Sequence, residues 1–202
     1  MANAMSDRST SSAPEQAIVG LEGVAAARKR GPAPVHLWNP PFCGEIDMRI
    51  ASDGTWYYAG SPIGRQPLVE LFASILRKDG ERYFLVTPVE RVAIRVDDAP
   101  FLAIAMQSQG AGETRQLSFR SNVEDEVIAG AEHPLRFETG AADGLKPYVH
   151  IRAGLWALVK RALFYDLAAL GEPGEHNSEA WFGVRSQGVF FPMRPMREID
   201  GL

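Results

Sequence analysis

The sequence predicts an α+β fold made of two related halves, each with a strand, a hairpin, a helix and a further strand. Three observations support it: alternating polar and apolar residues lead into an Asp-Gly turn, an amphipathic helix follows, and a shortened copy of this order returns near the C-terminus. We expect the second half to be a mostly antiparallel bent sheet or small roll of about seven short strands and one helix.

The first copy runs from Glu45 to Val86. Its first strand has apolar residues at every second position, Ile46, Met48 and Ile50. Asp53-Gly54 favours a hairpin turn because glycine accepts positive φ at no steric cost, and 56–59 is the expected return strand.

A helix is predicted next. Its apolar positions follow the i, i+3, i+4, i+7 pattern of one helical face: Leu68, Leu71, Phe72 and Ile75. We expect Lys78-Asp79-Gly80 to end this helix and 83–86 to form the next strand.

The second copy begins at Lys146. Residues 146–152 alternate, Gly154-Leu155-Trp156 repeats Gly54-Thr55-Trp56, and 179–184 mirrors 81–86. A helical stripe lies between them, formed by Leu163, Leu167 and Leu170 and ended by Gly171. We expect 171–178 to be a long exposed loop and the chain from Pro192 onward to be a tail.

The predicted domain organisation has three parts. Residues 1–30 form a flexible N-terminus and a helix, 31–98 the N-terminal repeat domain, and 99–202 the C-terminal repeat domain. The expected helix runs from about Pro14 to Arg30, with an apolar stripe at Ile18, Leu21, Val24 and Ala25.

Composition excludes several classes of protein. The 202 residues carry a net charge of −4, which argues against broad binding to nucleic acids or acidic membranes. The single cysteine, Cys43, excludes an internal disulfide and a cysteine-rich zinc site. No apolar run approaches the roughly 18 residues of a membrane span, and no secretory pattern opens the chain. We therefore expect a soluble, cytoplasmic protein.

Four segments carry a family resemblance: Trp38-Asn39-Pro40-Pro41, the hairpin Asp53-Gly54-x-Trp56, the break Gly60-Ser61-Pro62-Ile63 and Trp181-Phe182-Gly183-Val184. In this order they resemble a bacterial domain-of-unknown-function family, number 1285, over roughly residues 34 to 192. The resemblance implies a two-part α+β fold with a repeated motif, no established activity, and a ligand-binding or signalling role. It carries over no catalytic residue.

Catalytic groups are weakly indicated. Glu45 and Asp47 share a strand face, but Arg49 lies on it too, which favours a solvated or cleft-lining face over an acid–base pair. Cys43 lies downstream of His36, but nothing in the sequence brings the two together. We therefore expect this free cysteine to be buried and to pack as a small hydrophobic residue. The four histidines lack a close ligand spacing, so we predict neither a metal nor a cofactor.

The leading hypothesis is a non-enzymatic small-ligand-binding or signalling module with its site at the interface of the two repeats. Superposing Ile50 on Ile151 places Arg49 against His150. If the two halves pack about a pseudo-twofold axis, we expect the related polar faces to meet in a cleft that takes a small anionic ligand. The predicted site residues are Trp38, Asp47, Arg49, Arg65, Tyr148, His150 and Arg152. Two alternatives stay open: a protein–protein interaction module, and an enzyme of unknown type using Cys43 or the Glu45/Asp47 pair.

Overall fold

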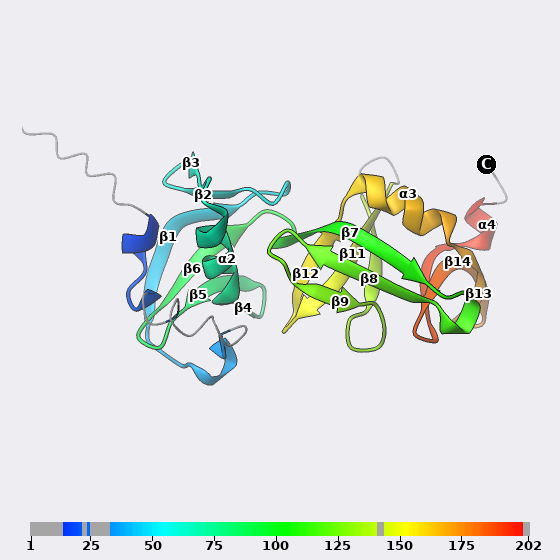
Figure 1. The fold of residues 1–202 in the computed structure, drawn as a ribbon, viewed down its shortest axis with the longest axis horizontal. Coiled ribbons are helices and arrows are strands. Elements are labelled where there is room, and N and C mark those ends of the chain that lie inside the picture. The colour runs from blue at the N-terminus through cyan, green and yellow to red at the C-terminus, as the bar shows by residue number, and fades with distance from the viewer. Residues whose placement is uncertain (1–13, 22–23, 25–32, 141–143, 200–202) are drawn as a thin grey trace, which may run out of the picture.

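The computed structural model describes residues 14–21, 24, 33–140 and 144–199. It confirms the α+β fold with two related halves, which lie side by side along the long axis of the molecule (Figure 1). The N-terminal tail expected over 1–13, and residues 22–23 and 25–30 of the expected helix, lie outside the described residues.

The first half is one curled six-stranded sheet with a helix. Its elements are β1 (Phe42–Ile50), β2 (Trp56–Tyr58), β3 (Ser61–Pro62), α2 (Gln66–Ser74), β4 (Leu76–Asp79), β5 (Arg82–Val86) and β6 (Arg91–Val96). The strand order is β3-β2-β1-β6-β5-β4. The last strand, β6, returns beside β1 in parallel and completes the sheet.

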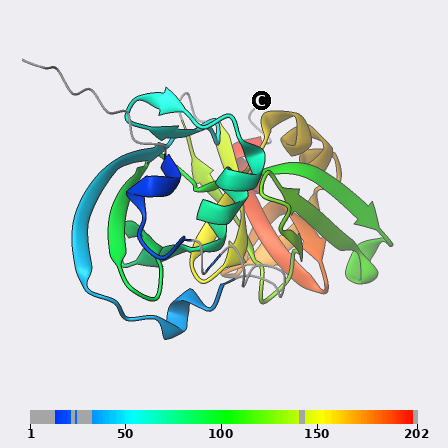
Figure 2. The same ribbon diagram turned by 60° about the vertical axis from the view of Figure 1, so that its left-hand side comes forward.

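Helix α2 packs against the concave side of this curled sheet (Figure 2). It buries Leu68, Val69, Phe72 and Ala73. The Phe72 ring stacks on the Trp56 indole of β2, with 6.1 Å between ring centroids. The apolar face predicted from the spacing is therefore buried, and it packs the helix against the β1–β2 hairpin.

The end of α2 differs from the prediction. The helix stops at Ser74, and the residues expected to end it form β4, which pairs antiparallel with β5. Gly80-Glu81 is the turn of that hairpin, with Gly80 at a φ of +58°. Leu76 is buried opposite Leu85, so cross-strand burial outweighs one more turn of helix.

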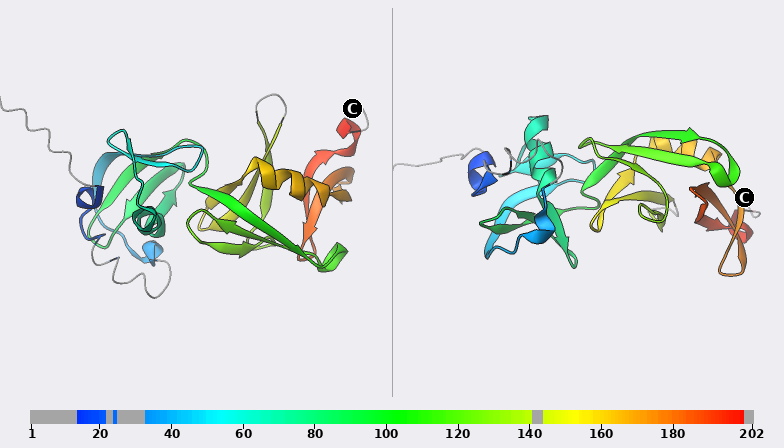
Figure 3. Two further views of the ribbon diagram at one scale, coloured as in Figure 1. Left: turned by 45° about the horizontal axis from the view of Figure 1, so that its top comes forward. Right: turned by 60° about the horizontal axis from the view of Figure 1, so that its bottom comes forward.

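The second half contains nine strands in two sheets within the described residues. Its elements are β7 (Phe101–Gln109), η4 (Gly112–Thr114), β8 (Gln116–Ser121), β9 (Glu126–Ile128), β10 (Leu135–Thr139), β11 (Leu145–Arg152), β12 (Leu155–Val159), α3 (Arg161–Ala169), β13 (Glu172–His176), β14 (Glu179–Ser186), β15 (Val189–Pro195) and α4 (Met196–Ile199). The six-stranded sheet has the order β10-β11-β12-β7-β8-β9, and the other sheet is β13-β14-β15. In both views of Figure 3, the three-stranded sheet lies at the end farthest from the first half.

Two expectations for the C-terminal region are wrong. Residues 171–178 contain strand β13, because the Phe182 and Phe190 rings lie over Gly171 and Gly174 and protect a backbone that has no side chains of its own there. The expected tail from Pro192 contains the end of β15 and the short helix α4. Prolines are tolerated in β15 because it is an edge strand with a bulge in its pairing near Pro192.

The order of elements repeats as predicted. The series β1, β2, α2, β4, β5, β6 recurs as β11, β12, α3, β13, β14, β15, so 179–184 does correspond to 81–86. The Gly-x-Trp match is out of register, however. Trp56 lies opposite Ile50 and is buried, whereas Trp156 lies opposite His150 on a partly exposed face, and Leu155 is buried instead.

The N-terminal segment docks on the first half. It contains η1 (Pro14–Ala17), and the predicted stripe residues Ile18, Leu21 and Val24 are buried. The Thr87 hydroxyl donates to the Val19 carbonyl at 2.8 Å, and the Val19 N–H donates to the Glu90 carboxylate. A later turn, η3 (Val35–Leu37), covers the β4 edge, where Arg77 donates to two of its carbonyls.

One apolar core runs through both halves. Within the described part of the chain, no helix is long and apolar enough to cross a membrane.

Candidate ligand-binding site at the junction of the two halves

Two consecutive aspartates in the segment between β6 and β7 tie the halves together. Asp97 accepts a hydrogen bond from Arg49 of the first half at 3.2 Å. Asp98 accepts from two groups of the second half, the Lys146 ammonium at 2.6 Å and the Tyr148 hydroxyl at 2.7 Å. The predicted residues Arg49 and Tyr148 therefore approach the same segment from opposite sides.

The pKa values of this group reflect its packing. Burial by itself raises the pKa of Asp98, but the hydrogen bonds from Lys146 and Tyr148 and nearby positive charges more than compensate, so the pKa lies below its ordinary value. Burial raises the pKa of Tyr148, and its hydrogen bond to the Asp98 carboxylate raises it further. Asp98 is thus held as a carboxylate and Tyr148 as a neutral donor.

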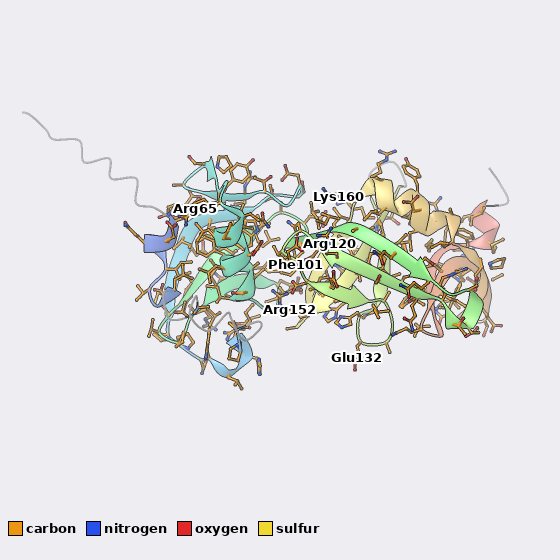
Figure 4. All side chains as sticks on the ribbon, in the orientation of Figure 1. Arg65, Phe101, Arg120, Glu132, Arg152 and Lys160 are labelled. Atoms are coloured by element: carbon orange, nitrogen blue, oxygen red, sulfur yellow. The ribbon has the colours of Figure 1, made fainter. Side chains whose placement is uncertain are left out.

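Arg152 makes the most direct contact across the junction (Figure 4). Its guanidinium donates to the Ala73 carbonyl at 2.9 Å, in the last turn of α2, where a cation also opposes the negative end of the helix dipole. It also pairs with Asp125 and lies 5.1 Å from the centre of the Phe101 ring. Asp125, in the acidic stretch Glu124-Asp125-Glu126, therefore has a structural role at the junction.

A second contact flanks the first. The Gln66 amide at the start of α2 donates to the Asn122 carbonyl at 2.9 Å. Gly54, at a φ of +80°, lies so close to Leu102 that an added Cβ would fall 2.8 Å from its Cδ1. The hairpin turn of the first half thus needs glycine for both its backbone and its contact with the second half.

A hollow of about 400 Å³, here called the linker hollow, lies on the first half where β6 enters the connecting segment. Its lining consists of Glu45, Ile46, Glu81, Arg82, Tyr83, Ala93, Ile94, Arg95, Val96 and Asp97. Burial raises the pKa of Tyr83, and Arg136 of the second half lies close enough to act on it in the opposite direction. The hollow therefore adjoins the junction.

Charges of both signs surround the linker hollow. Arg82 pairs with Glu45 at 2.7 Å, and Arg95 pairs with Asp47 at 3.3 Å. The arrangement offers guanidinium donors and carboxylate acceptors within one shallow site.

His150, also predicted, belongs to a neighbouring cluster. The Gly154 N–H donates to its Nε2 at 3.1 Å, so Nδ1 carries the proton and donates to the Glu132 carbonyl at 3.1 Å. The His133 ring stacks on it with 5.9 Å between centroids. Both ring nitrogens of His150 are therefore already in use.

Sequence reasoning missed three residues around His150. The Arg136 guanidinium lies 4.3 Å from the Trp156 ring centre and 4.9 Å from that of Tyr148, and His133 completes the group. Arg136 belongs to β10, and nothing in the sequence showed that this strand would lie beside residues 146–152.

The other two predicted residues lie away from the junction contacts. Arg65 is exposed and pairs with Glu15 of the N-terminal segment (Figure 4). Trp38, expected to be exposed, is partly buried against Phe84, Val86 and Ala93. The structure thus brings Arg49, Tyr148 and Arg152 to the junction and Asp47 to the edge of the linker hollow, but not Arg65 or Trp38.

The groups considered for catalysis are not arranged as catalytic pairs. Glu45 and Asp47 each face an arginine rather than one another. Cys43 was expected to be buried but is exposed, because β1 begins at Phe42 on an open part of the sheet. Its thiol lies 3.6 Å from the Pro41 carbonyl, and no described histidine forms a hydrogen bond with it. Among the described residues, no group of three or more metal-ligating side chains is present.

Comparison with known proteins gives a consistent family. The model described as the N-terminal domain of a domain of unknown function, DUF1285, matches residues 33–99, and the C-terminal DUF1285 model matches 100–193. The division at residues 98 and 99 itself stays a prediction. No curated protein matches the chain.

Two solved structures are similar. One is a DUF1285 family protein from Silicibacter pomeroyi DSS-3, with 50% identity, a TM-score of 0.80, and coverage of 90% of this chain and 98% of that one. The other is a DUF1285 family protein from Shewanella baltica OS155, with 27% identity, a TM-score of 0.46, and coverage of 59% of this chain and 87% of that one. Because the two family models together match most of the chain, and the chain is 50% identical to the first relative over 90% of its length, this protein belongs to the DUF1285 family.

Proposed function

We propose that this protein is a non-enzymatic module that binds a small zwitterionic ligand, such as a free amino acid, in the linker hollow. The observation that supports it is the hollow of about 400 Å³ beside the connecting segment, lined by two guanidiniums and three carboxylates. A ligand carrying both charges suits this lining better than a simple anion, because the acidic residues repel an anion that has no cationic group.

The ion pairs around the hollow are easily exchanged. The side chains of Arg95 and Asp47 are 71% and 64% exposed, and solvated pairs of this kind contribute about 0–1 kcal/mol. A ligand carboxylate on Arg95 and a ligand ammonium on a neighbouring carboxylate replace such pairs at little loss. The anionic group predicted from the sequence is thus one end of the proposed ligand.

The position of Asp97 supports a signalling role as part of this proposal. It lines the hollow, pairs with Arg49, and directly precedes Asp98, which holds Lys146 and Tyr148 of the second half. A ligand ammonium that competes with Arg49 for Asp97 acts on the segment that joins the halves. Occupancy of the hollow then alters the junction.

The test is a thermal-shift series with free amino acids and, for each, the matched amine and the matched carboxylic acid. A ligand at about 100 times its Kd stabilises the protein by roughly 2.7 kcal/mol, so at least one zwitterion raises the Tm while its two singly charged analogues do not. The variant Arg95→Gln loses this shift. The matched control Arg120→Gln, which removes an exposed arginine paired with Glu124, retains it.

Three results contradict the proposal. One is a panel in which no amino acid at about 10 mM raises the Tm. Another is a shift given equally by the matched acids. The third is a shift that persists in Arg95→Gln, which places binding elsewhere.

A further inference from the structure

A second hollow, of about 550 Å³, lies in the second half and shares no lining residue with the linker hollow. It is bounded by Gly140 and Gly144, which lie between β10 and β11, by the ends of β11 and β12, and by the first turns of α3. Its apolar lining residues are Leu145, Pro147, Leu158, Val159, Phe164 and Tyr165. We call it the α3 hollow. Its size lies within the roughly 300–1,000 Å³ typical of small-molecule sites.

The aromatic part of this lining is open to solvent. Tyr165 is 59% exposed, and Phe164 is only partly buried, although both belong to a helix that packs on a sheet. Exposed aromatic side chains beside a hollow favour an apolar ligand, since covering them removes apolar surface from water.

Two cations stand at the hollow, Lys146 and Arg161, and no described lining residue carries a carboxylate. Lys146 is already engaged with Asp98. Arg161 donates through Nε to the Tyr165 hydroxyl at 3.1 Å and forms no ion pair with any carboxylate in the described part of the chain. Within residues 14–140 and 144–199, as far as these are described, its two terminal amino groups have no hydrogen-bond acceptor, so they can donate to a ligand anion.

We propose that the α3 hollow binds a medium-chain aliphatic or aromatic carboxylate. The hydrocarbon part lies against Leu158, Phe164 and their neighbours, and the carboxylate accepts hydrogen bonds from Arg161, whose planar guanidinium matches the two carboxylate oxygens. Lys146 adds positive charge from the strand side. The required chemistry, an apolar body with one anionic end, differs from the zwitterion proposed for the linker hollow.

Decanoate is the probe, and isothermal titration calorimetry on the full chain measures its binding. We expect saturable binding of one decanoate, and about tenfold weaker binding of decanol, which has the same chain without the charge. Acetate, which has the charge without the chain, is expected not to bind. Arg161→Gln raises the Kd for decanoate at least about tenfold. Arg161 is exposed, so its replacement leaves the fold intact and, unlike a change at Lys146, leaves the Asp98 contact in place.

Two control variants keep the result specific. Arg197→Gln removes an exposed arginine of the same half, paired with Glu179 at 2.7 Å, and leaves decanoate binding unchanged. Arg95→Gln alters the linker hollow and also leaves it unchanged. Leu158→Asp places a negative charge in the apolar lining and abolishes binding. The proposal is overturned if decanoate does not bind at about 1 mM, if decanol binds equally well, or if Arg161→Gln binds decanoate as the wild type does.

Discussion

The two helices of the repeated motif occupy very different environments. Helix α2 buries four residues and stacks Phe72 on Trp56, whereas α3, of equal length, buries only Leu167 and borders a hollow. The same order of elements has thus produced one helix that is largely buried and one that is mostly exposed.

Strand pairing explains the difference. In the first half, β6 takes the edge of β1 that β2 leaves free, so the sheet curls around α2. In the second half, β10 takes the corresponding edge of β11, and β15 is left in a separate three-stranded sheet. Helix α3 must then lie across two sheets. A repeated motif does not guarantee a repeated core, and the α3 hollow lies in the half whose sheet does not close around its helix.

The largest expected effect tests the two helix cores directly. Phe72→Ala removes a fully buried ring and is expected to lower the free energy of unfolding by about 3–5 kcal/mol, whereas Phe164→Ala, at a partly exposed ring, lowers it by about 1 kcal/mol. Urea unfolding monitored by circular dichroism measures both. Equal losses would show that α3 is packed as tightly as α2.

The next effect concerns the contact between the halves. Arg152→Met removes the hydrogen bond to Ala73 and leaves Asp125 without its partner, so we expect a loss of roughly 2 kcal/mol. The control Arg120→Met breaks an exposed pair with Glu124 in the same half and costs at most about 0.5 kcal/mol. If both variants unfold at the same urea concentration, Arg152 does not hold the halves together.

The smallest expected effect is a dependence of stability on pH that is due to His150 and is therefore confined to the second half. Burial lowers the pKa of His150, the His133 charge adds to this, and the hydrogen bond with the Glu132 carbonyl opposes it. Because the folded-state pKa lies below the ordinary value of about 6.5, the unfolded chain binds the extra proton first. The stabilisation from neutral His150 is therefore complete above about pH 6.5 and is lost as the pH falls through the folded-state pKa.

Thermal unfolding followed between about pH 7.5 and 5.5 measures this dependence. We expect the Tm of the wild type to fall as the pH is lowered, and the part of this fall that is due to His150 to be absent in His150→Gln. The control variant His36→Gln removes an exposed imidazole in η3 and is expected to show the same fall as the wild type. No histidine lies in the sheet of the first half, between residues 42 and 96, so the acid-sensitive region is expected in the second half. An unchanged decline in His150→Gln would assign it to other groups.

Much of the local structure could be predicted from the residues alone. The alternation at Ile46, Met48 and Ile50, the Asp53-Gly54 turn and the stripe around Phe72 each describe short-range geometry, and each appears where expected. The predictions were wrong where contacts between residues far apart in the chain determine the secondary structure. Leu76 joined a strand because Leu85 lies opposite it, and residues 172–176 became a strand because phenylalanine rings cover Gly171 and Gly174.

The candidate site was predicted in part for the same reason. The alternation predicted from the sequence sets Tyr148 and His150 opposite Leu158 and Trp156 of β12, but a bulge between His150 and Arg152 shifts the register at Arg152. The hydrogen-bond partners of the three side chains come from elsewhere in the chain: Asp98, Glu132 and Ala73. Polar side chains with satisfied partners and polar side chains open to a ligand look alike in a sequence.

The sequence by itself determined the family, the α+β class and the repeated order of elements, because these depend on local periodicity, turn chemistry and motifs in order. The tertiary structure alone decided which strand edge each half would use. Edge pairing joins residues far apart in the chain and depends on which strand arrives beside β1 or β11. That choice closed the sheet around α2 and left α3 beside an open hollow.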